Sequence, residues 1–247
     1  MKILAIDTSG LQASAAIISA TDSAVDSYIT VGEIILNART GEKSWTHSEI
    51  LMPGIENLFA LTRLAPKDID YVAYTCGPGS FTGLRIGAAS ALAFARAINK
   101  SAIPVPTLDA LAYNVLHTGS GGIIIPMLDA RRGQVYTAVY LRDEIGLIER
   151  KTDFVALSIE NLIEGILCEY ETEKHFFLGD GACANYEIIS QKVSNSIFLP
   201  ANNNRTCASS VAVCALEKIS KGYEVPKEIE IIYVRAPQAV REREFVT

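Results

Sequence analysis

The stretch Cys76-Gly-Pro-Gly-Ser-Phe-Thr-Gly-Leu-Arg-Ile-Gly-Ala88 decides how this chain is expected to fold. An apolar, β-prone run at 71–74 leads into it, and the glycines and proline then form a sharp turn. A helical pattern follows from about Leu84 to Ile98. This order of strand, turn and helix predicts an α/β protein with free backbone N–H groups near the start of the helix.

Small residues recur at a spacing of four along the predicted helix, at Gly83, Gly87, Ala91 and Ala95. Three interpretations are open. The N–H groups at the helix start would suit a phosphate, but neither G-x-x-x-x-G-K-[ST] nor G-x-G-x-x-G fits the stretch. The small residues would also let the helix lie close to its own sheet, or let a partner helix approach. We favour a face for a partner.

The composition suits a single large domain or two smaller lobes with a well-buried core. The chain has 247 residues, of which 49% are hydrophobic and 20% charged. Its net charge of −6 disfavours binding to nucleic acid without a partner. Five cysteines without a C-x-x-C pair argue against a disulfide framework and a zinc ribbon. With no signal peptide and no apolar run of about 20 residues, we expect a soluble cytoplasmic protein.

The first part of the chain predicts three antiparallel strands before any helix. Residues 2–6, 12–19 and 28–37 read as these strands. Plain Rossmann folds place a helix after the first strand, so this order argues against them. Thr46 and Glu49 have the spacing of a capping box, which predicts that the first helix begins there.

A similar pattern returns about 120 residues later. The first strand leads to Asp7, a turn and a return strand; residues 123–128 lead to Asp129, a turn and a return strand at 134–140. We interpret this as the duplication of one supersecondary unit. Two acids from duplicated hairpins, facing each other across a cleft, would be the arrangement that holds Mg-ATP in actin-like and hexokinase-like kinases.

The stretch 118–122 (Thr-Gly-Ser-Gly-Gly) is the most flexible-looking part of the sequence. We therefore expect a first lobe at 1–117 and a second, shorter lobe at 118–247. The second lobe is expected to end with a helix at 208–220 and a closing strand at 229–235.

Five stretches spread over nearly the whole chain carry a family resemblance. They are Ile3-Leu-Ala-Ile-Asp-Thr-Ser9, His47-Ser-Glu-Ile-Leu-Met-Pro53, Gly77-Pro-Gly-Ser-Phe-Thr-Gly-Leu-Arg-Ile-Gly87, Leu128-Asp-Ala-Arg-Arg-Gly-Gln-Val-Tyr136 and Tyr233-Val-Arg235. Together they resemble the TsaB (YeaZ-like) family of the actin-like, sugar-kinase and Hsp70 superfamily. The run from Gly77 to Gly87 is highly specific, and the others are jointly strong. The span 21–46 is longer than the family pattern.

The resemblance implies a two-lobed actin-like ATPase (ribonuclease H-like) fold with mixed sheets and an abbreviated second lobe. It implies a non-catalytic partner of the TsaD-type threonylcarbamoyl transferase, which makes threonylcarbamoyladenosine in tRNA. The ATPase subunit of the same complex would be a further partner, and tRNA would be met only through the complex. Alone, the chain would form a homodimer. No cofactor would be required, and no membrane would be involved.

The resemblance places the partner or dimer interface on two helices of the first lobe. The residues assigned to this interface are His47, Leu51, Ile55, Gly83, Leu84, Gly87, Ala88, Ala91 and Ala95. The alternative is an ATP-dependent enzyme that acts through Asp7 and Asp129. For weak binding of ATP or ADP with Mg, the candidate residues are Asp7, Thr8, Ser9, Asp129, Arg131, Gly179 and Gly181.

No residue is assigned a catalytic or metal-binding role. The three histidines are His47, His117 and His175, so the sequence has neither H-x-x-x-H nor H-E-x-x-H. A peptidase reading of the superfamily would need such a metal site. Ser80 is not in a G-x-S-x-G elbow and is expected to cap the backbone of the following helix.

Overall fold

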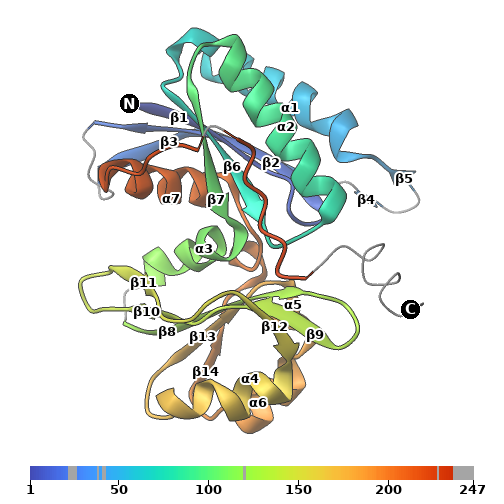
Figure 1. Ribbon diagram of the computed structural model, residues 1–247, viewed down its shortest axis with the longest axis vertical. Helices are drawn as coiled ribbons and strands as arrows, with labels where there is room; N and C mark the ends of the chain where they lie inside the picture. Colours follow the sequence, from blue (N-terminus) through green and yellow to red (C-terminus); the bar gives the residue numbers. More distant parts are fainter. Residues whose placement is uncertain (22–26, 38, 41–42, 119–120, 227, 236–247) are drawn as a thin grey trace. The chain divides into compact units, whose positions relative to one another are not determined.

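The computed structural model describes residues 1–21, 27–37, 39–40, 43–118, 121–226 and 228–235 (Figure 1). The chain forms two compact units. Of the described residues, the first contains those within Met1–Ala110 and Thr206–Ile232, and the second those within Leu111–Arg205 and Tyr233–Arg235. This corrects the expected division into 1–117 and 118–247.

The helix α7 (Ala208–Ser220) explains the difference in the division. It contacts β1, β2, β6 and β7 of the first unit. Its apolar residues Val211, Ala212, Ala215 and Leu216 are buried. Burial of this apolar side therefore assigns the last helix to the first sheet, although it lies near the end of the sequence.

The sheet of the first unit has five strands in the order β3-β2-β1-β6-β7. Its members are β1 (Lys2–Asp7), β2 (Gln12–Ala20), β3 (Tyr28–Asn37), β6 (Tyr71–Gly77) and β7 (Ser101–Pro106). The first three strands pair antiparallel, as predicted, and β1, β6 and β7 run parallel. A small separate hairpin joins β4 (Arg39–Thr40) to β5 (Lys43–Ser44), and the short η1 (Pro66–Asp68) precedes β6.

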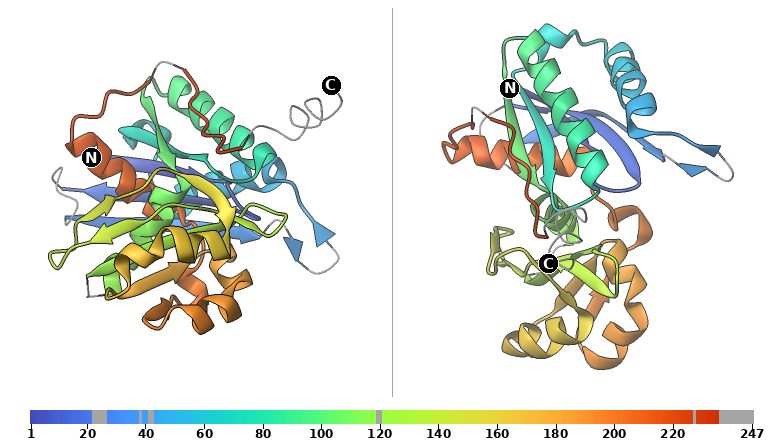
Figure 2. Two further views of the ribbon diagram at one scale, coloured as in Figure 1. Left: turned by 60° about the horizontal axis from the view of Figure 1, so that its bottom comes forward. Right: turned by 45° about the vertical axis from the view of Figure 1, so that its right-hand side comes forward.

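Two helices cover one face of this sheet, and α7 covers the other (Figures 1 and 2). They are α1 (His47–Thr62) and α2 (Phe81–Ala97), whose rings Phe59 and Phe94 stack with centroids 5.7 Å apart. The Glu49 carboxylate accepts a hydrogen bond from Thr46 N at 2.6 Å, as the predicted capping box requires.

The second unit repeats the strand arrangement of the first. Its sheet has the order β11-β10-β8-β13-β14, and β9 pairs with both β8 and β12. The strands are β8 (Gly122–Asp129), β9 (Gln134–Thr137), β10 (Tyr140–Arg142), β11 (Ile148–Arg150), β12 (Val155–Ser158), β13 (His175–Leu178) and β14 (Ser196–Phe198). As in the first unit, the strand ending in the acid pairs antiparallel with its hairpin partner and parallel with the next strand. The predicted duplication is confirmed.

The helices of the second unit are short. The unit includes α4 (Ile159–Gly165), α5 (Asp180–Ala184) and α6 (Tyr186–Lys192). The 3-10 turns are η2 (Tyr113–Thr118), η3 (Leu167–Tyr170) and η4 (Ala201–Asn203), and α3 (Thr107–Ala112) joins the two units. Residues 159–170 form the two short elements α4 and η3 and not one continuous helix.

The strand predicted at 229–235 is not formed. This segment bonds to β6 at isolated points: Ile232 N donates to Cys76 O at 2.7 Å, and Glu230 N donates to Tyr74 Oη at 3.3 Å. A strand needs a repeated ladder of backbone bonds. β-prone composition alone did not supply one here.

Candidate functional site

The turn between β6 and α2 packs tightly against the turn between β1 and β2. Ser80 N donates to Ser9 O at 2.7 Å. A Cβ on Gly79 would lie 2.6 Å from the same Ser9 oxygen, so only glycine fits there. The Ser80 hydroxyl accepts a hydrogen bond from Gly83 N at 3.2 Å, which confirms the predicted cap of α2.

The stripe of small residues on α2 faces the interior of its own unit. A Cβ on Gly83 would lie 2.0 Å from Thr8 O, and one on Gly87 would lie 2.2 Å from Thr8 Oγ1. The Thr8 hydroxyl in turn donates to Gly83 O at 2.8 Å. Ala91 and Ala95 continue the stripe into the core between α2 and the sheet. The glycines therefore admit the β1–β2 turn to near backbone contact with the helix.

This arrangement corrects the interface residues assigned from the sequence. All but one of them are buried in the first unit, namely Leu51, Ile55, Gly83, Leu84, Gly87, Ala88, Ala91 and Ala95. The remaining one, His47, is half-buried. A side chain buried in its own unit presents no surface to a partner. Small residues spaced by four occur where a helix packs on its own sheet and also where it packs on another helix. The spacing alone therefore does not distinguish these two cases.

The opposite side of the same two helices is exposed and was missed from the sequence. On α1, Met52 is 47% exposed; on α2, Phe81 is 40% exposed, and the Arg85 guanidinium lies 3.8 Å from its ring centroid. Ala89 and Ala93 are exposed on the next turns of α2. We call these five residues the α1–α2 outer face. The sequence contained one indication of this face: Ala89, Ala93 and Ala97 form a second set of small residues spaced by four.

Asp7 lies at the end of β1, and its side chain bonds to neighbours in its own unit. One of its carboxylate oxygens, Oδ1, accepts hydrogen bonds from Ser9 N (3.0 Å), Ser9 Oγ (2.6 Å) and Thr75 Oγ1 (2.8 Å). Burial raises the pKa of Asp7, and the hydrogen bonds from Ser9 and Thr75 oppose that rise only in part. The neutral acid is thus favoured more than in an exposed aspartate.

Asp129, the equivalent residue of the second unit, is exposed. Its Oδ1 accepts a hydrogen bond from Arg131 N at 2.8 Å, and its Oδ2 lies 3.7 Å from Arg131 Nη1. Asp129 N donates to Asp180 Oδ1 at 3.0 Å. The carboxylate of Asp129 therefore organises its own turn.

The two glycines predicted near a nucleotide have packing roles. Gly179 has φ 99° and a Cβ there would lie 2.1 Å from Met127 O. Its N–H donates to Asn204 Oδ1 at 2.6 Å. A Cβ on Gly181 would lie 3.0 Å from Met127 C. Both glycines thus let α5 approach β8 closely.

These residues do not fit a Mg-nucleotide site of the actin-like kind within either unit. Such a site needs ionised carboxylates with free oxygens and free backbone N–H groups. Asp7 is buried with its pKa raised. Asp129 Oδ1 already accepts a hydrogen bond from Arg131 N, and Gly179 N donates to Asn204 Oδ1. We derive no catalytic step through a nucleotide.

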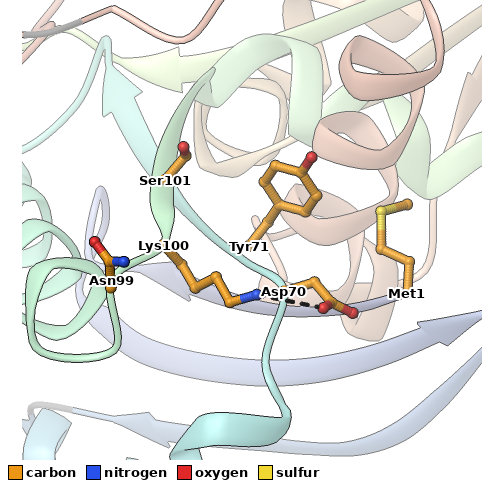
Figure 3. Close-up of a pocket in the computed structure, with 6 residues that line it drawn as sticks. All are labelled: Met1, Asp70, Tyr71, Asn99, Lys100 and Ser101. Atoms are coloured by element: carbon orange, nitrogen blue, oxygen red, sulfur yellow. Dashed lines mark ion pairs between the residues drawn. The ribbon is translucent and has the colours of Figure 1, made fainter.

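A pocket of about 600 Å³ lies at the other end of the first sheet (Figure 3). It is lined by Met1, Asp70, Tyr71, Asn99, Lys100 and Ser101. Lys100 Nζ and Asp70 Oδ1 form an ion pair across it at 3.7 Å. Tyr71 and Ser101 are the first residues of β6 and β7. Ligands of parallel sheets bind at the carboxyl ends of strands, where Asp7 lies, so this pocket is not the site predicted around Asp7.

Comparison with known proteins settles the family. Residues 41–237 match the family model described as TsaD: tRNA N6-adenosine threonylcarbamoyltransferase. The Bacillus subtilis (strain 168) protein named tRNA threonylcarbamoyladenosine biosynthesis protein TsaB is 30% identical over 199 residues, which cover 81% of this chain and 80% of that protein. The chain belongs to the TsaB (YeaZ-like) family.

Solved structures show the fold of this TsaB-family chain. A Pseudomonas aeruginosa protein described as uncharacterized, with similarity to peptidase YEAZ, has a TM-score of 0.76 at 20% identity and covers 95% of this chain and 99% of its own. An inorganic polyphosphate/ATP-glucomannokinase from an Arthrobacter species has a TM-score of 0.51 at 10% identity. The match covers 90% of this chain and 99% of the kinase chain. The expected two-lobed actin-like ATPase fold is confirmed, and at these identities the likeness extends no further than fold.

The described residues contain neither a candidate membrane span nor a candidate metal cluster. None of their helices combines the length and apolar character that crossing a membrane requires. Within the same residues, no group of three or more His, Cys, Asp or Glu side chains is placed to hold a metal ion.

Proposed function

We propose that this chain is a non-catalytic partner of a TsaD-type threonylcarbamoyl transferase in the threonylcarbamoyladenosine modification of tRNA. The TsaB relatives, named for threonylcarbamoyladenosine biosynthesis, support the process. The observation that carries the partner role is the α1–α2 outer face, since Met52 and Phe81 expose large apolar side chains on helices whose inner sides are filled. The ATPase subunit of the same cytoplasmic machinery would join the assembly.

The outer face has the composition of a docking surface. Phe81 and Arg85 stack, and aromatic and arginine side chains are enriched at the centre of interfaces. Ala89 and Ala93 next to them permit close approach of another helix, because they carry only a methyl group. A complex would bury these apolar side chains, at about 25 cal/mol for each Å² removed from water.

The test is co-elution of this chain with the TsaD-type relative from the same organism on a sizing column. We expect Ala93→Arg to abolish the complex and to leave the melting temperature of the isolated chain unchanged, because the residue is exposed. Ala184→Arg makes the same change at an exposed position of the second unit and should leave the complex intact. A complex that survives Ala93→Arg would refute docking through the outer face.

The same face is proposed to pair two copies when the chain is alone. Wild type should then elute as a dimer and Ala93→Arg as a monomer. A dimer that persists in the variant would place the homodimer contact elsewhere.

We further propose that no cofactor is required. The observation behind this is that Asp7 and Asp129 are each engaged by their own neighbours. Titration calorimetry of the chain with Mg-ATP should give no heat of tight binding. Tight binding that disappears in Asp7→Ala would instead favour the alternative, an ATP-dependent enzyme of the actin-like superfamily.

A further inference from the structure

The turn between β8 and β9 holds two arginines in a backbone conformation that few residue types adopt. Arg131 has φ 64° and Arg132 has φ 56°, and Gly133 follows with φ 68°. Gln134 N donates to Arg131 O at 3.2 Å, which closes a tight turn around Arg132 and Gly133. Such turns favour Asn-Gly, because both central residues need positive φ. The backbone gives no reason for arginine here, which points to a role for the guanidinium groups.

The two guanidinium groups are accessible. The Arg131 side chain is 83% exposed, and Arg132 is exposed as well. The ion pair of Arg131 with Asp129 spans 3.7 Å, and exposed ion pairs of this kind are weak. Arg131 can therefore exchange its carboxylate partner for another anion. Figure 1 shows the turn in yellow-green at the end of the β8–β9 hairpin.

A third arginine, from far along the chain, holds the base of the turn. Arg235 Nη1 donates to Ala130 O at 2.8 Å, and its guanidinium lies 5.7 Å from the Tyr136 ring centroid. Its Nη2 is buried with no hydrogen-bond acceptor among the described residues. Arg235 thus fixes the turn and adds a positive charge at its base, next to Ala130.

We propose that the β8–β9 turn contacts the phosphate backbone of tRNA, with Arg131 and Arg132 as ligands and Arg235 as a positioning residue. This inference rests on the proposed function, since tRNA would meet this chain in the complex. Guanidinium groups bind phosphate in a bidentate manner, and backbone contacts need no base pocket. The net charge of −6 gives no general attraction to RNA, so the contact must be local.

The experiment measures binding of an unmodified tRNA transcript to the complex with the TsaD-type partner, by fluorescence anisotropy over a series of salt concentrations. The double variant Arg131→Asn/Arg132→Asn removes both charges and keeps the turn, because asparagine tolerates positive φ. We expect roughly tenfold weaker binding at low salt and a salt slope reduced by about two, one for each lost phosphate contact. Lysine at both positions should restore much of the affinity.

The control is Arg63→Asn. Arg63 is exposed and has φ 57°, so it matches the turn arginines in backbone and charge but lies in the first unit. It should leave affinity and salt slope unchanged. Asp129→Asn should strengthen tRNA binding, because it frees Arg131 from its ion pair while Oδ1 still accepts from Arg131 N.

Several outcomes would overturn the inference. An intact complex in which the double variant binds tRNA with wild-type affinity and salt slope overturns this inference alone. Loss of the complex in the double variant makes the turn a protein contact, and loss of Mg-ATP binding in place of tRNA binding makes it a nucleotide contact. If wild type forms no complex on the sizing column, the proposed function and this inference fail together.

Discussion

The turns that follow Asp7 and Asp129 occupy equivalent places in two sheets of the same strand order, yet their surroundings differ. Asp7 is buried and accepts three hydrogen bonds from Ser9 and Thr75. Asp129 is exposed and pairs with Arg131 in its own turn. The first turn is thus part of a core, whereas the second lies at the surface.

The helices that follow the neighbouring parallel strands explain this divergence. In the first unit α2 is 17 residues long, and its glycines clamp the Asp7 turn through Thr8. In the second unit the corresponding α5 has 5 residues. One side of the long helix α2 packs against its own unit and the other side is exposed. The short helix α5 leaves the Asp129 turn exposed. Under the two proposals made above, the first unit would provide the docking surface and the second a polar contact turn.

The largest expected effect tests the clamp in the first unit. Gly83→Ala would place a Cβ 2.0 Å from the Thr8 carbonyl oxygen, and a backbone atom has little room to move. We expect the free energy of unfolding to fall by about 3 kcal/mol, as for strongly overpacked sites. Urea denaturation of the isolated chain measures it.

The matched control for this change is Gly165→Ala in the second unit. A Cβ there would meet no heavy atom within 4 Å, and Gly165 is the last residue of α4. The free energy of unfolding of the Gly165→Ala variant should be unchanged or raised by less than about 1 kcal/mol. If both variants unfold at the same urea concentration, Thr8 is not clamped and the inward orientation of the stripe is refuted.

Local patterns in the sequence were sufficient for the strands and for much of the fold. The bounds of β3 and α7 match the predicted ranges, because hydrophobic period is a local signal. The strand–Asp–turn–strand pattern also revealed the duplication. The segment 229–235 shows what local patterns do not predict. It is β-prone, but a segment becomes a strand only where it can pair with the edge of a sheet along its length.

The functional surface was harder to predict, because long-range contacts choose which side of a helix faces inward. Gly83 and Gly87 face the core because Thr8, 75 residues from Gly83, bonds there. The start of α7 is held in the same way, since Ser209 N donates to Glu33 across 176 residues. A spacing of four along one helix contains no information about such partners. The sequence predicts only a nucleotide-binding role for Arg131, and the positive φ values of Arg131 and Arg132 are visible only in the structure.

The smallest expected effect compares the two acids directly, through Asp7→Asn and Asp129→Asn. Folding raises the pKa of Asp7 above its unfolded value of about 3.9, so above that pH the native state retains a proton that the unfolded chain releases. Stability that depends on Asp7 therefore falls as the pH rises through this range. Asparagine cannot ionise, and its Oδ1 can still accept the bonds from Ser9 and Thr75.

We therefore expect Asp7→Asn to be more stable than wild type at pH 7 to 8, by about 1 kcal/mol or 2–4 °C in melting temperature. The gain should shrink toward pH 4, where the native acid is neutral and about half of the unfolded chains also retain the proton. Asp129→Asn should change stability by less than about 0.5 kcal/mol at either pH, because its ion pair is exposed. Melting curves of wild type and both variants at pH 4 and pH 7.5 test this prediction. A loss of stability in Asp7→Asn that is equal at both pH values would mean that burial does not govern Asp7, and that the two turns differ less than their structures indicate.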